Sequence, residues 1–348
     1  MVEVATDAIV VLAVVVLALS VLIVIVRATR RLLHRRRARL AERPRLALLE
    51  FVAEAGADDD ATPQADELVA MPRREWRAAE PGAIALLGKV RGEAHTMLVD
   101  VFARRGLITE ELADLTHRSR VRRARAAEAL GNLEHRPAVP ALCALLDDPH
   151  AEVRLVAVRA LGRIGDPAAA VPLLDSLARA DPTPSQLVAQ SLAQLGPDAE
   201  PALSSALDHP EARVRVTALD ALGLVGSAAL VEPVARVLEH DPSLDVRRAA
   251  ANTLGRMGGR AAVPPLVVAL GADHPDPLRA VAARALGEAG AAGVADALAG
   301  LLDDPAYRVA HEAAHALRRA GPAGLAALRG AASPHAAEAL AAAEVGGR

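Results

Sequence analysis

The stretch that decides the fold runs from residue 147 to residue 167 and reads DDPHAEVRLVAVRALGRIGDP. It opens with an Asp-Pro turn, and a proline in the first turn of a helix is a start signal. Apolar residues then recur at Val153, Ala157 and Leu161, a spacing that places them on one face of a helix. Gly165 follows, and a glycine there predicts a left-handed helix end. The stretch therefore predicts one amphipathic helix between two turns.

The same pattern recurs along the chain. Leucines equivalent to Leu161, the key leucines, stand at positions 130, 161, 192, 222, 254, 286 and 317. A glycine follows four residues after six of them, and Glu134 takes that place in the first copy. A shorter apolar run lies between each glycine and the next turn. Because helical pairs that recur every 30 to 32 residues are typical of α-solenoids, we predict an all-α, right-handed solenoid of about seven helix pairs over residues 119–330.

The composition agrees with thin, repeated helical layers. Hydrophobic residues make up 52% of the chain and aromatic residues only 1%, so the core has to be built from Ala, Leu and Val. Alanine and leucine are also strong helix formers. The single cysteine, Cys143, excludes an intramolecular disulfide. Lys89 is the only lysine among 40 basic residues, which we interpret as GC-rich coding of a bacterial type.

The quoted stretch resembles the bacterial HEAT repeats of the phycobilisome-lyase type. The residues that carry the resemblance are Asp148-Pro149, Val153-Arg154 and the run from Ala160 to Pro167, and it extends over about residues 119–330. That family includes lyases, lyase subunits, hydroxylases and non-catalytic scaffolds, so the resemblance implies the fold more than the function. It also implies a structural ladder in which one recurring arginine of each unit pairs with turn aspartates such as Asp148. These arginines precede the key leucines by seven positions: Arg123, Arg154, Arg215, Arg247 and Arg279.

Residues 8–26 predict a transmembrane helix. They contain only Ala, Val, Leu, Ile and one Ser. At 1.5 Å per residue the segment spans roughly 29 Å, close to the thickness of the bilayer hydrocarbon. A cleaved signal peptide would begin with basic residues and have a shorter apolar stretch, whereas Glu3 and Asp7 precede this one. We therefore predict a single-pass protein of the bacterial inner membrane, with residues 1–7 as an extracytoplasmic tail.

The charge pattern predicts the orientation. Residues 27–45 contain nine arginines and one acidic residue, and the positive-inside rule places this juxtamembrane segment and everything after it in the cytoplasm. The segment Arg27–Arg45 is also suited to anionic lipid headgroups, at about 1 kcal/mol per arginine, although orientation alone is the simpler explanation. Of the net charge of −3, residues 1–26 carry −2 and residues 27–45 carry +8, which leaves −9 for residues 46–348. An acidic body argues against nucleic-acid binding.

The regions between and after these segments are less regular. Residues 46–83 include three consecutive aspartates, Asp58 to Asp60, and predict a flexible linker. Residues 84–118 predict a helical lead-in to the repeats, and residues 331–348 a C-terminal cap or tail.

The longer helix of each unit is expected to line the concave surface, which solenoids use for binding. Residues six and two positions before the key leucines, and two positions after them, form its non-core stripe. We predict a groove for a protein partner there, with a solvated helix face as the alternative. The candidate residues are Arg159, Arg163, Gln190, Arg248, Asn252, Arg256, Arg284, His311, His315 and Arg319. We expect a membrane-tethered scaffold without catalytic activity or cofactor, and membrane-anchored HEAT proteins of similar appearance imply a role beside an enzyme such as a glycosyltransferase.

One motif supports a different hypothesis. The run from His311 to His315 reads HEAAH, which matches the HExxH pattern of zinc proteases. A zinc site needs a third ligand, for which Glu338 is available. The pair His311-Glu312 also resembles the iron-binding pairs of HEAT-type deoxyhypusine hydroxylases, but its equivalents in the other units, such as Arg248-Ala249, are not ligands. The alternative function is a lyase-like or metal-dependent HEAT enzyme, or enzyme subunit, that uses His311, Glu312 and His315. We expect no metal.

Overall fold

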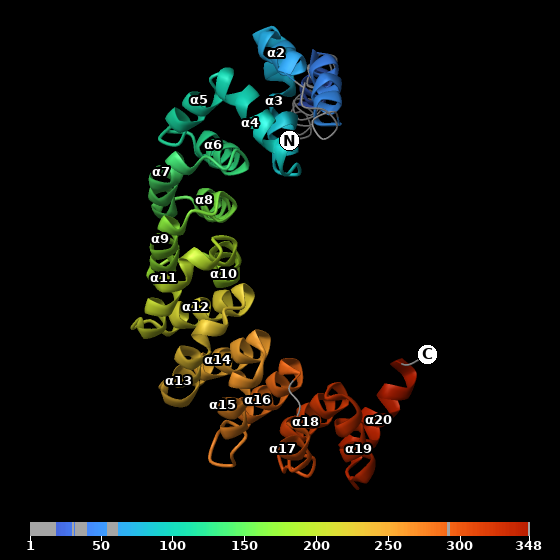
Figure 1. The fold of residues 1–348 in the computed structure, drawn as a ribbon. Helices are drawn as coiled ribbons and strands as arrows, with labels where there is room; N and C mark the ends of the chain where they lie inside the picture. The colour runs from blue at the N-terminus through green and yellow to red at the C-terminus, as the bar shows by residue number, and fades with distance from the viewer. Residues whose placement is uncertain (1–18, 30, 32–39, 54–61, 291–292, 347–348) are drawn as a thin grey trace, which may run out of the picture. The chain divides into compact units, whose positions relative to one another are not determined.

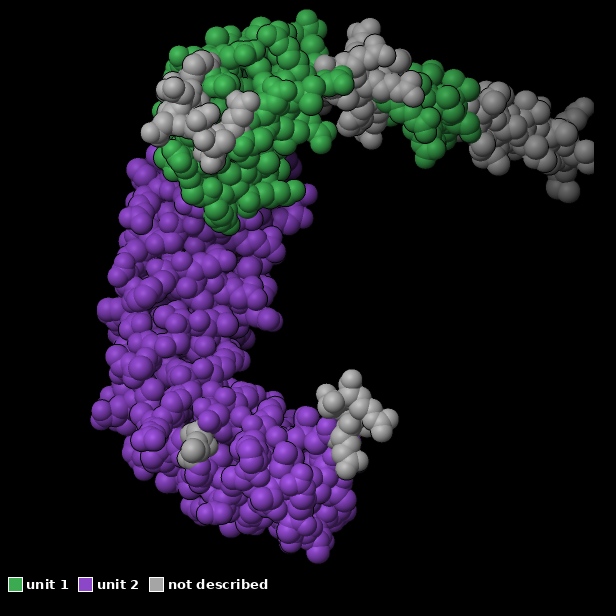
Figure 2. Space-filling view, turned by 45° about the vertical axis from the view of Figure 1, so that its right-hand side comes forward, with its two compact units in different colours: residues 1–110 green, residues 111–348 purple. Residues whose placement is uncertain are grey.

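The computed structural model describes residues 19–29, 31, 40–53, 62–290 and 293–346, and within these ranges helices are the regular elements, with no strand. The chain divides into two compact units, residues 1–110 and residues 111–348, coloured separately in Figure 2. Residues 8–18 of the predicted transmembrane helix, and residues 1–7 before it, lie outside the described residues. Among the described residues, no helix is both long and apolar enough to cross a bilayer.

Unit 1 is folded where a flexible linker was expected. Its described helices are residues 40–53, α2 (Thr62–Ala70), α3 (Arg73–Leu87) and α4 (Glu93–Arg104), and α5 (Leu107–Asp114) crosses into unit 2. Phe51, Leu68 and Trp76 are each no more than 4% exposed. The rings of Trp76 and Phe102 meet edge to face with centroids 5.3 Å apart. The prediction of a flexible linker over 46–83 is therefore wrong for its described part, because these side chains form a core.

Arg105 fixes the end of α2 within unit 1. Its guanidinium donates hydrogen bonds to the carbonyl oxygens of Leu68, Val69 and Met71, at 2.6, 2.7 and 3.1 Å. The same guanidinium lies 4.3 Å from the centre of the Trp76 ring, in a cation–π contact. The last carbonyls of a helix lack partners within it, so Arg105 satisfies groups that α2 leaves open.

Unit 2 is a stack of helix pairs, and its longer helices lie along the concave side of the stack in Figure 1. The long helices are α6 (Arg120–Asn132), α8 (Ala151–Ile164), α10 (Ser185–Gln194), α12 (Ala212–Val225), α14 (Leu244–Met257), α16 (Asp276–Ala289) and α18 (Tyr307–Arg319). The short helices, along the outer side, are α7 (Val139–Ala144), α9 (Ala170–Asp175), α11 (Glu200–Ser205), α13 (Val231–His240), α15 (Val263–Val268), α17 (Ala295–Ala299) and α19 (Gly321–Gly330). A last helix, α20 (Pro334–Gly346), follows them.

The predicted buried stripe of the long helices is confirmed. Val153, Ala157 and Leu161 of α8 are fully buried, and so are their equivalents at 214, 218 and 222 in α12 and at 246, 250 and 254 in α14. The repeat period therefore places the same face of each long helix in the core.

The predicted left-handed helix ends are confirmed at Gly165, Gly226 and Gly290, whereas Gly196 and Gly258 combine a positive φ with an extended ψ of −166° and −164°. All six glycines that follow the key leucines by four positions have positive φ, between 63° and 79°. Glu134 stands at the same place in the first unit and also has a positive φ, 50°. A residue with a Cβ is strained by roughly 1–2 kcal/mol in this conformation, so the architecture imposes the turn even where the sequence lacks glycine.

A second set of glycines lets neighbouring long helices approach closely. A Cβ built on Gly131 would lie 2.7 Å from the Cα of Ala160, and one on Gly287 would lie 2.7 Å from the Cα of Ala316. Both glycines directly follow a key leucine. The spacing between stacked units therefore depends on a missing side chain at this position.

Candidate functional site

The arginine ladder implied by the repeat pattern is present in unit 2. Arg123 forms an ion pair with Asp148 at 2.6 Å, and both side chains are at most 11% exposed. Three more ladder arginines pair with the turn aspartate of the following unit: Arg154 with Asp181, Arg215 with Asp241, and Arg279 with Asp304. Arg247 forms no ion pair within the described part of the chain. The ladder is a structural feature, because its guanidinium groups are buried and already bound.

Three of the four ladder aspartates also accept a backbone hydrogen bond in the turn before a long helix. Oδ1 of Asp148 accepts a hydrogen bond from the backbone N–H of His150 at 2.9 Å, and Asp241 and Asp304 accept the equivalent bonds at 2.8 and 2.9 Å. Burial alone would raise the pKa of Asp148, but the hydrogen bonds from Arg123 and from the His150 backbone outweigh it and lower that pKa. The carboxylate is therefore held in its charged form, where it links one unit to the next.

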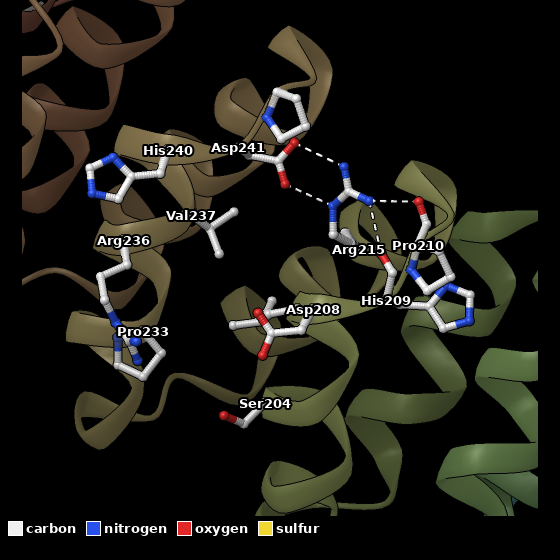
Figure 3. A pocket seen from close by; sticks show the side chains of 12 residues that line it. Ser204, Asp208, His209, Pro210, Arg215, Pro233, Arg236, Val237, His240 and Asp241 are labelled. Atoms are coloured by element: carbon white, nitrogen blue, oxygen red, sulfur yellow. Dashed lines mark hydrogen bonds and ion pairs between the residues drawn. The ribbon is translucent and has the colours of Figure 1, made fainter.

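A cavity lies beside the Arg215–Asp241 pair of this ladder (Figure 3). It has a volume of about 480 Å³ and is lined by residues of α12, α13 and the turn at Asp208. Arg215 forms part of its wall, but its guanidinium donates to both oxygens of Asp241 and to the carbonyl oxygens of His209 and Pro210. Four of the five N–H donors of this arginine are already used in this way, so the cavity is not the best candidate for a site.

The ten predicted groove residues all lie on the long helices of the concave side. Arg159 and Arg163 are on α8 and Gln190 is on α10. The others are on α14, α16 and α18: Arg248, Asn252, Arg256, Arg284, His311, His315 and Arg319.

Several groove residues are paired with one another or with neighbours. Arg284 donates a hydrogen bond to Oδ1 of Asn252 at 2.7 Å, and Arg163 donates to Oδ1 of Asn132. Arg256 lies 3.9 Å from Asp220, whose pKa is raised by burial and partly lowered again by that arginine. These contacts join successive long helices, so part of the predicted groove serves the stack.

Other groove residues are open to a partner. Arg159, Gln190 and Arg319 are exposed and form no hydrogen bond or ion pair with another described residue. Arg248 is bound only to Asp245, three residues earlier on the same helix, at 3.2 Å. Exposed arginines without a fixed partner can form bidentate bonds with carboxylates, which suits an acidic or mixed-polar protein segment.

The histidines at the C-terminal end of the concave side are clustered. The rings of His311 and His315 lie with centroids 4.4 Å apart. Burial lowers the pKa of His315, and the nearby His311 and Arg318 lower it further. The Nδ1 atom of His311 lies 3.9 Å from Glu338, the residue expected as a third ligand.

The comparison with protein families decides the classification. The family described as HEAT repeats matches residues 109–193 and 199–287, together half of the chain. The chain belongs to the HEAT-repeat family.

One curated relative of this HEAT-repeat protein is the bilin biosynthesis protein PecE of a Nostoc species. The two are 34% identical over 122 residues, which cover 34% of this chain and 48% of PecE. The HEAT-repeat protein thus spans about half the length of this relative.

Solved structures with similar helical arrays are more distant. Human deoxyhypusine hydroxylase is 21% identical, with a TM-score of 0.33, over 79% of this chain and 97% of that one. Kap121p bound to Nup53p is 17% identical, with a TM-score of 0.47, over 85% of this chain and 41% of that one. Similarity at this level says nothing about the function of the HEAT-repeat protein.

The expectation that the chain has no enzymatic role is wrong in light of its relatives. The match with a bilin biosynthesis protein points toward enzyme-like HEAT proteins. The expectation rested on the repeat pattern, in which the equivalents of the His311-Glu312 pair in the other units are not ligands. A repeat fold does not by itself determine the function, so this pattern does not exclude an enzymatic role.

Sequence reasoning missed two groups of residues on the concave side. Asn132 stands two positions after the key leucine of the first unit, the same register that identified Arg163, and it is the acceptor for that arginine. The glycines next to the key leucines were missed as well. Their recurrence at one position of the repeat was a signal for close helix packing, because glycine has no Cβ and lets a neighbouring backbone come near.

Proposed function

We propose that this HEAT-repeat protein is a lyase-like enzyme or enzyme subunit that holds a protein substrate on the concave surface of its long helices. The observation that carries the proposal is the row of open arginines there, above all Arg159 on α8, which is exposed and unpaired. The similarity to PecE supports the enzyme-like class. The ten groove residues contain no Phe, Trp or Tyr, so the surface suits a polypeptide better than a flat tetrapyrrole.

Charge reversal tests this surface. Arg159→Glu, Arg248→Glu and Arg319→Glu combined are expected to reduce recovery of the native partner by at least tenfold in affinity capture of the full chain from intact membranes, measured by quantitative mass spectrometry. The matched control reverses three exposed arginines of the outer side, Arg136, Arg236 and Arg260, with the same change in net charge. The proposal fails if both triple variants recover the same proteins as the wild type.

The enzyme-like class has its own test. Captured complexes of the wild type are expected to modify or turn over the captured protein, seen as a mass change that disappears with the concave triple variant. If the partner binds normally but its mass and abundance never change, the protein is a binding module and the lyase-like class is rejected.

We also propose that the predicted segment at residues 8–26 anchors the protein in a membrane, with Arg27–Arg45 and the repeats on the cytoplasmic side. Its described part, residues 19–26, is helical, and its large apolar side chains are exposed by 41–64%. Apolar side chains exposed on all faces of a helix favour a lipid environment. Carbonate extraction of membranes should leave the protein in the pellet, and protease should digest the repeats only in inverted vesicles. Release into the supernatant would contradict the anchor.

A further inference from the structure

The C-terminal end of unit 2 brings three potential metal ligands together from two helices. His311 comes from α18, and His335 and Glu338 come from α20, which packs against α18 (Figure 1). One ligand atom from each of the three lies within 4.8 Å of the others. The Nδ1 atom of His311 is 3.9 Å from Oε2 of Glu338.

The register of α20 explains why two of these side chains point the same way. His335 and Glu338 are three residues apart and therefore lie on one face of the helix. Each is directly followed by an alanine, Ala336 after His335 and Ala339 after Glu338, and both alanines are fully buried. Ser333, just before the helix, donates a hydrogen bond to the carbonyl oxygen of Leu302 at 2.8 Å. The packing of α20 thus fixes the direction in which His335 and Glu338 project.

An aromatic ring holds the two imidazoles in place. Tyr307, one turn before His311 on α18, stacks on the His311 ring with centroids 5.6 Å apart and an interplanar angle of 16°. The same tyrosine meets the His335 ring edge to face, at 4.9 Å. Because it contacts both imidazoles, Tyr307 restricts their orientation.

We infer that His311, His335 and Glu338 form a binding site for a divalent transition metal, with Zn²⁺ as the best-suited ion. Imidazole nitrogens and a carboxylate oxygen bind Zn²⁺ at about 2.0–2.2 Å, which separates the ligand atoms by roughly 3.4 Å in tetrahedral geometry. Small side-chain rotations bring the three atoms to that separation. Three protein ligands leave a fourth position for water or a substrate atom, the arrangement of catalytic rather than structural zinc.

The site differs from the one that the HExxH pattern suggested. That pattern uses His311 and His315 as the ligands and Glu312 as the base. The geometry replaces His315 by His335, and the carboxylate comes from Glu338 rather than Glu312. The His315 ring lies 4.4 Å from the His311 ring, closer than the His335 ring at 6.4 Å, so His315 offers a matched control that removes a nearer imidazole. The inference shares His311 with the groove but does not rest on the arginines that carry the proposed substrate surface.

Zinc binding to the full chain, purified in mild detergent and stripped with a chelator, tests the site. The wild type should bind one Zn²⁺ per chain by isothermal titration calorimetry and elemental analysis. His335→Ala should weaken binding by at least about 100-fold, since loss of an outer-shell partner alone costs 10–100-fold. His315→Ala should change the affinity by less than about threefold. Far-UV circular dichroism should show the same helical content in all three proteins.

Two further measurements make the result decisive. Glu338→Gln keeps the shape of the side chain but removes the anionic ligand, and it should reduce zinc affinity as His335→Ala does. Co²⁺ bound to the wild type should show the visible absorption of a four-coordinate ion, and this signal should be lost in His335→Ala. The inference is overturned if the wild type binds no stoichiometric zinc, or if His315→Ala loses zinc while His335→Ala retains it.

Discussion

Two rows of arginines run along the same long helices of unit 2, and they differ in almost every physical respect. The ladder row, Arg123, Arg154, Arg215 and Arg279, is buried and pairs with turn aspartates of the next unit. The concave row, of which Arg159 is the clearest member, is exposed and lacks fixed partners at several positions. On α8 the two rows are only five residues apart, at Arg154 and Arg159. The comparison teaches that helical register, rather than residue type, decides whether an arginine supports the stack or is open to a partner.

Breaking a buried ladder pair should have the largest effect. Asp241→Asn removes the negative charge that faces Arg215, and both side chains are no more than 10% exposed. Removal of one member of a buried pair costs roughly 3–5 kcal/mol, and we expect about 3 kcal/mol because Arg215 keeps its two carbonyl acceptors. Urea unfolding followed by far-UV circular dichroism measures the loss.

The ladder supplies its own control for that measurement. Asp181 pairs with Arg154 but is 82% exposed, so Asp181→Asn should cost less than about 1 kcal/mol. Equal losses in the two variants would show that burial does not set the strength of the ladder.

The contact between the long helices should give the next largest effect. Gly131→Ala places a methyl group 2.7 Å from the Cα of Ala160, which requires the two helices to move apart. Overpacking typically costs 1–3 kcal/mol, and the better helix propensity of alanine offsets about 1 kcal/mol, so a net loss of up to about 2 kcal/mol is expected. Thermal unfolding of the two proteins measures it.

Gly223→Ala is the matched control. Its nearest neighbours are atoms of the flexible Arg256 side chain at 3.3 and 3.4 Å, which can move away, so the substitution should be neutral or slightly stabilising. If Gly223→Ala destabilises as much as Gly131→Ala, close backbone approach is not the reason for glycine at this position.

The repeats could be predicted from the sequence because their signals are local and recur. The key leucines, the buried stripe and the glycine four residues later all follow from one register, and seven copies reduce the chance of error. Unit 1 could not be predicted in the same way. Trp76 packs on Phe102, and Arg105 caps α2 across 37 residues of sequence. Contacts of this kind occur once and leave no period to recognise.

The candidate site could be predicted from the sequence only as far as the repeat register determines it. The register placed all ten candidate residues on the long helices, but it could not distinguish Arg163, which donates to Asn132, from Arg159, which is unpaired. The group of His311, His335 and Glu338 could be predicted only in part from the sequence. Glu338 was considered because it is acidic and follows the motif, whereas His335 becomes relevant only once α20 folds back onto α18.

A smaller, stabilising effect is expected at the first helix end. Glu134 has a φ of 50°, where the other units have glycine. Glu134→Gly relieves the strain of a Cβ in the left-handed region, and after the entropy of the more flexible unfolded chain is subtracted it should stabilise by about 0.5–1 kcal/mol. The reverse change, Gly165→Ala, should destabilise by about 1 kcal/mol in the same denaturation assay. A destabilising Glu134→Gly would mean that the Glu134 side chain contributes a contact worth more than the strain.

The smallest change in stability is expected in the concave row. A comparison of stability with partner capture there separates a structural role from a binding role. Arg159→Glu alters an exposed side chain without a fixed partner, so the free energy of unfolding should stay within about 0.5 kcal/mol of the wild type. Arg154→Glu, five residues earlier on the same helix, should lose several times more, because it places a negative charge beside Asp181 and leaves the Asp148 carbonyl oxygen without its donor. Partner capture should show the opposite order when it is normalised to folded protein, with Arg159→Glu the more defective. If both variants lose stability and binding in proportion, the two rows form one structural network, and the concave surface is not a separate binding site.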